Sequence, residues 1–108
     1  MLHMSDFIIE LVDQAKEFIE SLDHIAYAKS MKSINLFYTY GGDLGYPHTK
    51  KIAKSLYELR IPGHPAVRLF FTTKDNRIIL FYGFLKKTNK LPKKELTMAL
   101  KLLRELVG

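Results

Sequence analysis

The sequence has 108 residues, which fits one domain (residues 1–108) with a single core, and its 47% apolar and 26% charged residues are ordinary for a soluble globular protein. It contains no cysteine, which excludes a disulfide framework and a thiolate site and favours a cytoplasmic location. The longest apolar run, residues 78–85, is far shorter than the roughly 20 residues of a membrane-spanning helix, and the N-terminus lacks the features of a signal peptide, so we expect neither a membrane nor an export segment.

Two helices are predicted within residues 1–40. After Asp13, a plausible N-cap, apolar residues recur at three- and four-residue spacings: Ala15, Phe18, Ile19 and Leu22. The preceding residues 7–12 are too few for periodicity to decide between an extra helical turn and a short strand. A second helix is expected over residues 24–40, with a buried stripe formed by Ile25, Ala28, Met31, Ile34, Phe37 and Tyr38.

A stretch rich in glycine and proline at residues 40–48 ends this helix, and the period then changes to that of strands. Residues 55–61, 66–71 and 77–85 read as three strands, and their short connections at 62–65 and 73–76 make an antiparallel meander. Pro92 opens a last helix, whose apolar face is Leu96, Ala99, Leu100, Leu103 and Leu106. The sequence therefore predicts an α+β domain in which all helices pack on one face of a small antiparallel sheet and leave the other face free.

Three charged residues are expected on that open face. Strand alternation directs the apolar Tyr57, Leu59 and Ile61 towards the helices, and Glu58, Arg60 and Arg68 away from them. The turn between the two strands brings the arginines within reach of each other, and because like charges on adjacent strands repel, Glu58 is expected to lie between them. The arrangement suits either an anion site or the solvated face of a half-covered sheet.

Positive charge is concentrated in the second part of the chain. Residues 1–40 carry three lysines and six acidic residues, whereas residues 41–108 carry fourteen basic and five acidic residues. This asymmetry favours a polyanion partner, nucleic acid before an acidic protein or a membrane surface, although a solvated basic face would look the same. Candidate RNA contacts are Lys50, Lys51 and Lys54 and, at one edge of the sheet, Lys86, Lys87, Lys90, Lys93 and Lys94, with Tyr82 and Phe84 available to stack on bases.

Three motifs in series resemble the HigB-like branch of the RelE/ParE toxin superfamily, from type II toxin–antitoxin systems. They are a G-x-P-x-x-K-K loop at residues 45–51, an L-Y-E-L-R strand at 56–60 and a G-F-x-K-K-x-x-K-x-P-x-x-E ending at 83–95. The likeness spans roughly residues 15–105. The family fold has two N-terminal helices, a small antiparallel sheet that often includes a short first strand, and a C-terminal helix, which favours a strand at residues 7–12.

The resemblance also implies a function. Similar proteins cleave mRNA on the translating ribosome, and a helix-turn-helix antitoxin of the HigA type neutralises them. The family pattern places basic catalytic residues at Arg60, Arg68, Lys86 and Lys87. Two features depart from the family pattern. No tyrosine stands near the start of the last helix, so that role is either absent or moved to Tyr82 or Tyr57, and Leu91 occupies the position where the family often has a threonine before the proline.

Metal-free RNA cleavage needs a base for the 2′-hydroxyl, donors for the phosphate and a proton for the leaving 5′ oxygen. Arginine suits the second task, because its guanidinium stays charged and grips phosphate bidentately. A lysine crowded by other cations gives up a proton more readily, so Lys86 or Lys87 could be the base or acid, with Glu58 as the second choice or as an orienting partner.

His3, His24, His48 and His64 show no metal-ligand spacing, so we expect no metal or other cofactor, although His48 and His64 could touch RNA from their loops.

Two other functions remain open from sequence alone. A ParE-like toxin would act through protein contact on a target such as gyrase. A non-catalytic RNA-binding module would use the same basic face only to hold phosphates, with salt-dependent affinity and no turnover.

Overall fold

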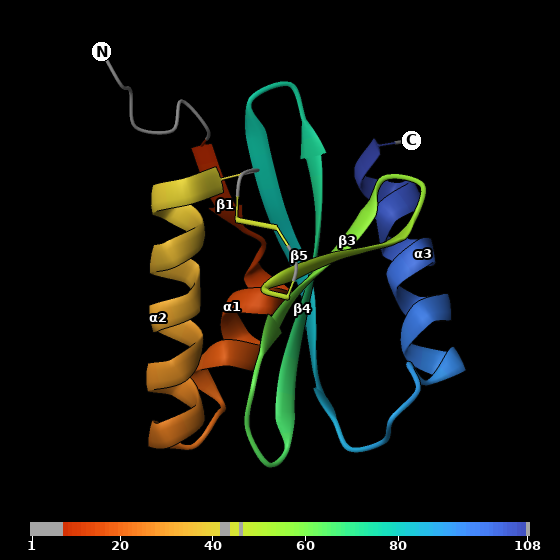
Figure 1. Ribbon diagram of the computed structural model, residues 1–108. Coiled ribbons are helices and arrows are strands. Elements are labelled where there is room, and N and C mark those ends of the chain that lie inside the picture. Colours follow the sequence, from red (N-terminus) through yellow and green to blue (C-terminus); the bar gives the residue numbers. More distant parts are fainter. Residues whose placement is uncertain (1–7, 42–43, 46, 108) are drawn as a thin grey trace.

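The computed structural model describes residues 8–41, 44–45 and 47–107 (Figure 1). Within these ranges the elements are β1 (Ile8–Leu11), α1 (Asp13–Glu20), α2 (His24–Tyr40), β2 (Thr49–Ala53), β3 (Leu56–Ile61), β4 (Ala66–Lys74), β5 (Arg77–Lys86) and α3 (Lys93–Val107). The predicted α+β class is confirmed. The strand expected over residues 7–12 is found at Ile8–Leu11, while Phe7 and His3 lie outside the described residues.

The sheet has the strand order β1-β5-β4-β3-β2. The meander of β3, β4 and β5 is antiparallel, as predicted, and β2 extends it by pairing antiparallel with β3. β1 joins the opposite edge and is parallel to β5, so the sheet is mixed. The prediction missed β2, because its sequence Thr-Lys-Lys-Ile-Ala lies next to glycines and a proline and has only a weak strand pattern.

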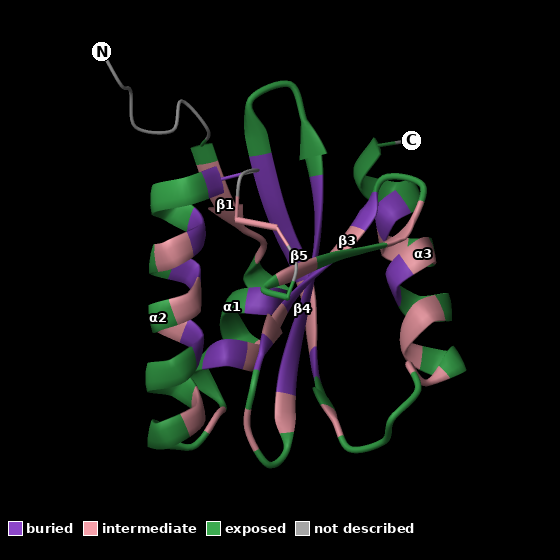
Figure 2. Ribbon diagram, viewed as in Figure 1, coloured by how far each residue is buried: buried purple, intermediate pink, exposed green. Residues whose placement is uncertain are grey.

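Helices cover both faces of the sheet, so the expectation of one free face was wrong (Figure 1). α1 and α2 pack on one face, where Ile19 and Phe37 join Leu59, Leu69 and other strand residues in one core. α3 packs on the other face, where Ala99 and Leu103 meet a second core formed by Leu56, Phe70, Ile79, Phe81 and Phe84. Figure 2 shows buried segments in the sheet between the two helical layers. The predicted alternation of β3 and β4 is confirmed, and the face that carries Glu58, Arg60 and Arg68 is the face that α3 partly covers.

The helices lie where the sequence predicted them, but some details differ: α1 ends at Glu20, so Leu22 of its predicted apolar pattern follows the helix. Val12 is the N-cap of α1 and Asp13 is its first helical residue. Asp23 caps α2, where its side chain accepts a hydrogen bond of 2.9 Å from the Ala26 amide. α3 begins at Lys93, after Pro92, so Leu91 is not its N-cap and instead packs against the second core.

The stripe predicted for α2 was partly wrong. Ile34 and Phe37 are buried, but Ile25 and Tyr38 are each 59% exposed and Ala28 is also exposed. The helix instead buries Ser30 on its inner face. Since α2 is apolar on more than one side, periodicity could not identify the side that faces the sheet.

No helix in the described part of the chain is long and apolar enough to cross a membrane.

Candidate functional site

The β3–β4 pair sets two arginines directly opposite each other. Arg60 of β3 is the register partner of Arg68 of β4. The carboxylate of Glu58 lies between them, with one oxygen 3.6 Å from Arg60 Nε and the other 3.6 Å from Arg68 Nε. The expected proximity of the arginines and the expected bridging carboxylate are both confirmed.

The two arginines differ in their access to solvent. The side chain of Arg68 is only 9% exposed, whereas that of Arg60 is 28% exposed. Arg68 Nη1 donates a hydrogen bond of 3.2 Å to the Val67 carbonyl, while its buried Nε has no hydrogen-bond partner among the described residues. Burial lowers the pKa of Arg68, the Glu58 charge opposes this and the Arg60 charge adds to it, although an arginine remains cationic throughout the physiological range.

Two adjoining hollows open beside this pair, and we call them together the basic groove. One, of about 430 Å³, lies between the β3–β4 turn and the loop after β5, and Arg68, His64, Lys86 and Lys87 line it. The other, of about 530 Å³, is lined by Arg60, Arg68, His48 and His64. Arg68 and His64 belong to both hollows, so the groove is continuous around them.

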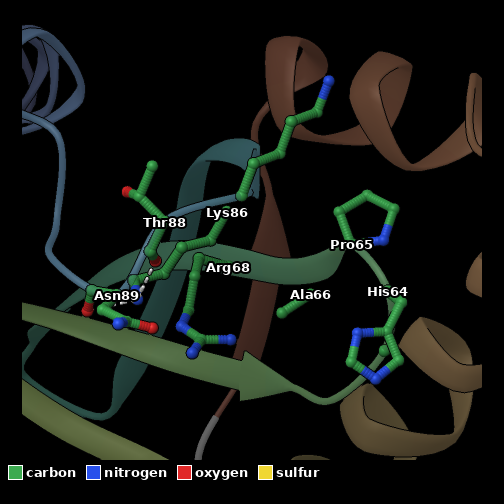
Figure 3. A pocket seen from close by; sticks show the side chains of 9 residues that line it. His64, Pro65, Ala66, Arg68, Lys86, Thr88 and Asn89 are labelled. Carbon is green, nitrogen blue, oxygen red and sulfur yellow. Dashed lines mark hydrogen bonds between the residues drawn. The ribbon is translucent and has the colours of Figure 1, made fainter.

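Lys86 occupies a structural position at one side of the groove. Its ammonium donates hydrogen bonds of 2.8 Å and 2.9 Å to the carbonyls of Thr88 and Asn89 (Figure 3). These bonds hold the loop after β5 folded back on the strand end. They also fix the position of the Lys86 side chain, whereas the neighbouring Lys87 is exposed.

The remaining lysines lie in two parts of the molecule, at β2 with its following turn and around the start of α3. Lys50 of β2 is the register partner of Glu58, so its side chain is on the face that carries the arginines, while Lys51 pairs with Tyr57 on the opposite face. Lys54 is exposed in the β2–β3 turn. Lys90, Lys93 and Lys94 are exposed around the start of α3, which follows the end of β5.

The two aromatic residues proposed for base stacking differ in burial, since Phe84 is buried and Tyr82 is partly exposed. Phe84 is 4% exposed and belongs to the second core, so that prediction was wrong. The partly buried Tyr82 lies against Phe70 and Phe84, and its hydroxyl donates a hydrogen bond of 2.6 Å to Glu95 of α3. Burial, with the Glu95 hydrogen bond and charge, raises the pKa of Tyr82 to about 12. Tyr57 stacks on Phe71 in the other core and faces away from the groove.

The sequence did not predict that two histidines would line the basic groove. Sequence placed His48 and His64 only in loops that flank a strand, and the structure brings both to the hollow that contains the two arginines. For His48 a signal was present, since it directly precedes the lysine-rich strand β2. For His64, four residues after Arg60 in a turn, only the hairpin geometry could bring its ring to the groove.

Comparison with known families bears on the class of protein. Residues 17–104 match the family model described as phage derived protein Gp49-like (DUF891). The chain belongs to this family. The Gp49-like family is a RelE-like, toxin-like family of toxin–antitoxin systems, which confirms the class that the three motifs predicted. No curated protein matches the chain.

The Gp49-like match includes the whole of the candidate site. It extends from within α1 to within α3, and so contains the β3–β4 arginine pair, Glu58, the basic groove and the loop that Lys86 holds. The groove is therefore part of the family domain and not an addition at either end.

Proposed function

We propose that this protein is the toxin of a type II toxin–antitoxin system and a member of the HigB-like branch, which cleaves mRNA on the ribosome without a metal ion and so inhibits translation. The observation that carries the proposal is the Arg60–Arg68 pair in the floor of an open groove. Two guanidinium groups side by side at an open groove are suited to bind a phosphate, because each can donate hydrogen bonds to its oxygens and stays charged.

In this proposal the arginines bind the scissile phosphate. Arg60, the more exposed of the two, reaches a phosphate oxygen from the side of the groove, and Arg68 supports the charge from its floor. Both favour the transition state, in which the phosphate carries additional negative charge. Glu58 orients the two guanidiniums; at 5% exposure and between two cations it is poorly placed to take a proton from RNA.

Exposed lysines supply contacts to the neighbouring phosphates. Lys50 shares a face with Glu58, Lys87 lines the groove, and Lys90 and Lys93 are exposed further along the chain, around the start of α3. Lys51 lies on the opposite face of β2 from Lys50, and Lys54 lies in the turn between β2 and β3. We propose that these two lysines contact ribosomal RNA, or mRNA further from the cleavage site. Such contacts position the substrate and carry no sequence information.

The partners follow from the same proposal. A toxin-like family implies an antitoxin, and we propose a helix-turn-helix protein of the HigA type. The proposed substrate is mRNA in the translating ribosome, which places the activity in the cytoplasm.

The test is expression of the protein in bacteria, with growth measured and transcript ends mapped by primer extension. The wild type is expected to arrest growth and to cut transcripts at codons in frame. Arg60→Ala and Arg68→Ala are expected to abolish both effects, while Arg104→Ala, which removes an exposed arginine of α3, leaves them intact. A circular dichroism spectrum of each purified variant checks that it folds.

The other outcomes identify the rival functions. Growth arrest with intact transcripts and damaged DNA indicates a ParE-like poison of gyrase. Salt-dependent RNA binding without cut ends indicates a non-catalytic binding module. Full toxicity in both arginine variants contradicts the assignment of the site.

A further inference from the structure

The groove needs a group that transfers protons near neutral pH, and several of its candidates are already engaged. Arg60 and Arg68 stay protonated. Glu58 is buried between the two arginines, and the Lys86 ammonium donates to two backbone carbonyls. An imidazole is the side chain whose unperturbed ionisation lies closest to neutrality, and the groove contains two of them.

His48 is held beside Arg60 by the backbone. Its carbonyl accepts a hydrogen bond of 2.7 Å from the Arg60 amide, which fixes the chain just before β2 against β3. The hollow that His48 lines also contains Arg60 and Arg68. Its exposed imidazole is therefore at the β2 side of the arginine pair.

His64 approaches the same pair from the β3–β4 turn. In Figure 3 its ring and the Arg68 guanidinium lie on either side of Ala66. His64 lines both hollows of the groove, so it faces the arginines on one side and the loop after β5 on the other. The two histidines come from different loops and reach one anion site.

We propose that His48 and His64 are the proton-transfer pair of this groove, an assignment that rests on the proposed RNA cleavage. One neutral imidazole removes the proton of the 2′-hydroxyl while that oxygen attacks the adjacent phosphorus. The bond from phosphorus to the 5′ oxygen breaks, and the other histidine, as an imidazolium, donates a proton to the departing oxygen. The products are a 2′,3′-cyclic phosphate and a 5′-hydroxyl, and the reaction consumes no water, metal or oxidant.

Charged groups lie on two sides of this pair. Towards the groove the histidines face the cations Arg60, Arg68, Lys86 and Lys87. On its other side His64 lines a separate, mainly apolar pocket with Asp23, His24 and Lys29 at the start of α2. The Asp23 carboxylate in that pocket accepts the hydrogen bond that caps α2.

The experiment measures single-turnover cleavage of mRNA in purified, programmed ribosomes by the wild type, His48→Gln and His64→Gln across roughly pH 5 to 9. The wild type is expected to show a bell-shaped profile. Each variant should cleave about 10²-fold or more slowly than the wild type. The variant that lacks the base should also lose the acidic limb of the pH–rate profile, and the variant that lacks the acid should lose the alkaline limb. Co-sedimentation with ribosomes should be unchanged, and His24→Gln, at the exposed start of α2, is the matched control.

A second substrate separates the two roles. In an mRNA with sulfur in place of the bridging 5′ oxygen at the cut codon, the leaving thiolate needs no proton. This substrate should restore cleavage to the variant that lacks the acid and not to the variant that lacks the base. Restored cleavage in both variants, or in neither, would contradict the assignment of the two histidines as acid and base.

The results also separate this inference from the proposed function. The inference fails, while the proposed nuclease function holds, if the wild type cuts and both histidine variants cut at the same rate. It also fails if both variants cut more slowly but keep the bell-shaped pH profile of the wild type. If the wild type leaves the mRNA intact, the proposed function fails and the inference fails with it.

Discussion

Arg60 and Arg68 are direct cross-strand partners in the antiparallel β3–β4 pair, so two cations oppose each other in the floor of the basic groove. Like charges in this position destabilise a sheet, and Glu58 offsets them with one carboxylate for two guanidiniums. An anion that enters the groove would add negative charge beside this pair. Stability and anion affinity should be coupled at this point.

Glu58→Gln tests this coupling. Because the change removes the carboxylate that lies between the two opposed arginines, we expect it to lower the free energy of unfolding by about 1–3 kcal/mol. Sulfate should restore more of this loss than chloride at equal ionic strength, since it can occupy the anion site. Urea unfolding measures both effects, and Glu105→Gln, on the exposed side of α3, is the control. Equal recovery in the two salts would contradict a specific anion site.

Lys86 and Lys87 are adjacent in sequence but should behave differently. Lys86→Gln removes the ammonium that binds the carbonyls of Thr88 and Asn89, so we expect a loss of stability of about 1 kcal/mol. Lys87→Gln should leave stability within about 0.5 kcal/mol of the wild type and weaken RNA binding, with a shallower dependence of affinity on salt. Thermal unfolding and filter binding of RNA at several salt concentrations compare the pair. The reverse pattern would show that Lys86 is the RNA contact.

The hydrogen bond from Tyr82 to Glu95 predicts a pH dependence at the alkaline end. The pKa of Tyr82 is raised from 10.0 to about 12, so between these values the unfolded state releases a proton that the folded state keeps. The stability from this bond is thus complete below about pH 10 and is lost as the pH approaches 12. Tyr82→Phe should cost about 0.5–1.5 kcal/mol at neutral pH, and its difference from the wild type should shrink towards pH 12.

Urea unfolding of the wild type and Tyr82→Phe at several pH values makes this comparison. The control is Tyr40→Phe, since Tyr40 is 54% exposed. A difference between wild type and Tyr82→Phe that stays constant up to pH 12 would argue against the hydrogen bond.

Gly83 marks the closest approach of β5 to α1. A Cβ at this position would lie 2.7 Å from Leu69 Cδ2 and would also overlap the ring of Phe18. Gly83→Ala should therefore lower the free energy of unfolding by about 1–3 kcal/mol through overpacking. Adding Phe18→Leu should recover part of the loss, and a double-mutant cycle by urea unfolding measures the coupling. Strictly additive effects would mean that the two residues do not compete for space.

Much of the fold follows from the sequence, and the reasons for the failures are physical. The hairpin with Glu58, Arg60 and Arg68 was predictable because alternation alone fixes the face of each side chain. The register was not, so the direct opposition of the arginines needed the structure.

The coverage of the second face was missed for another reason. α3 carries an ordinary apolar stripe, and nothing local in such a stripe says which face of a sheet it will meet. That single error also misplaced Phe84 and Tyr82, because residues read as exposed on a free face are packed beneath α3. The loop histidines were underrated because their position depends on a turn and a strand end that meet only in three dimensions.

The pairing of β1 has a consequence for the time at which this protein becomes active. Ile8 is among the first residues of the described chain to be synthesised, yet its register partner is Arg77, and α3, which covers the other face, emerges later still. Cotranslational folding can therefore not complete the sheet until β5 has been synthesised. On the proposed function, we expect a nascent chain that lacks β5 to be inactive, because Lys86 at the end of β5, Lys87 and the loop that follows line one side of the groove.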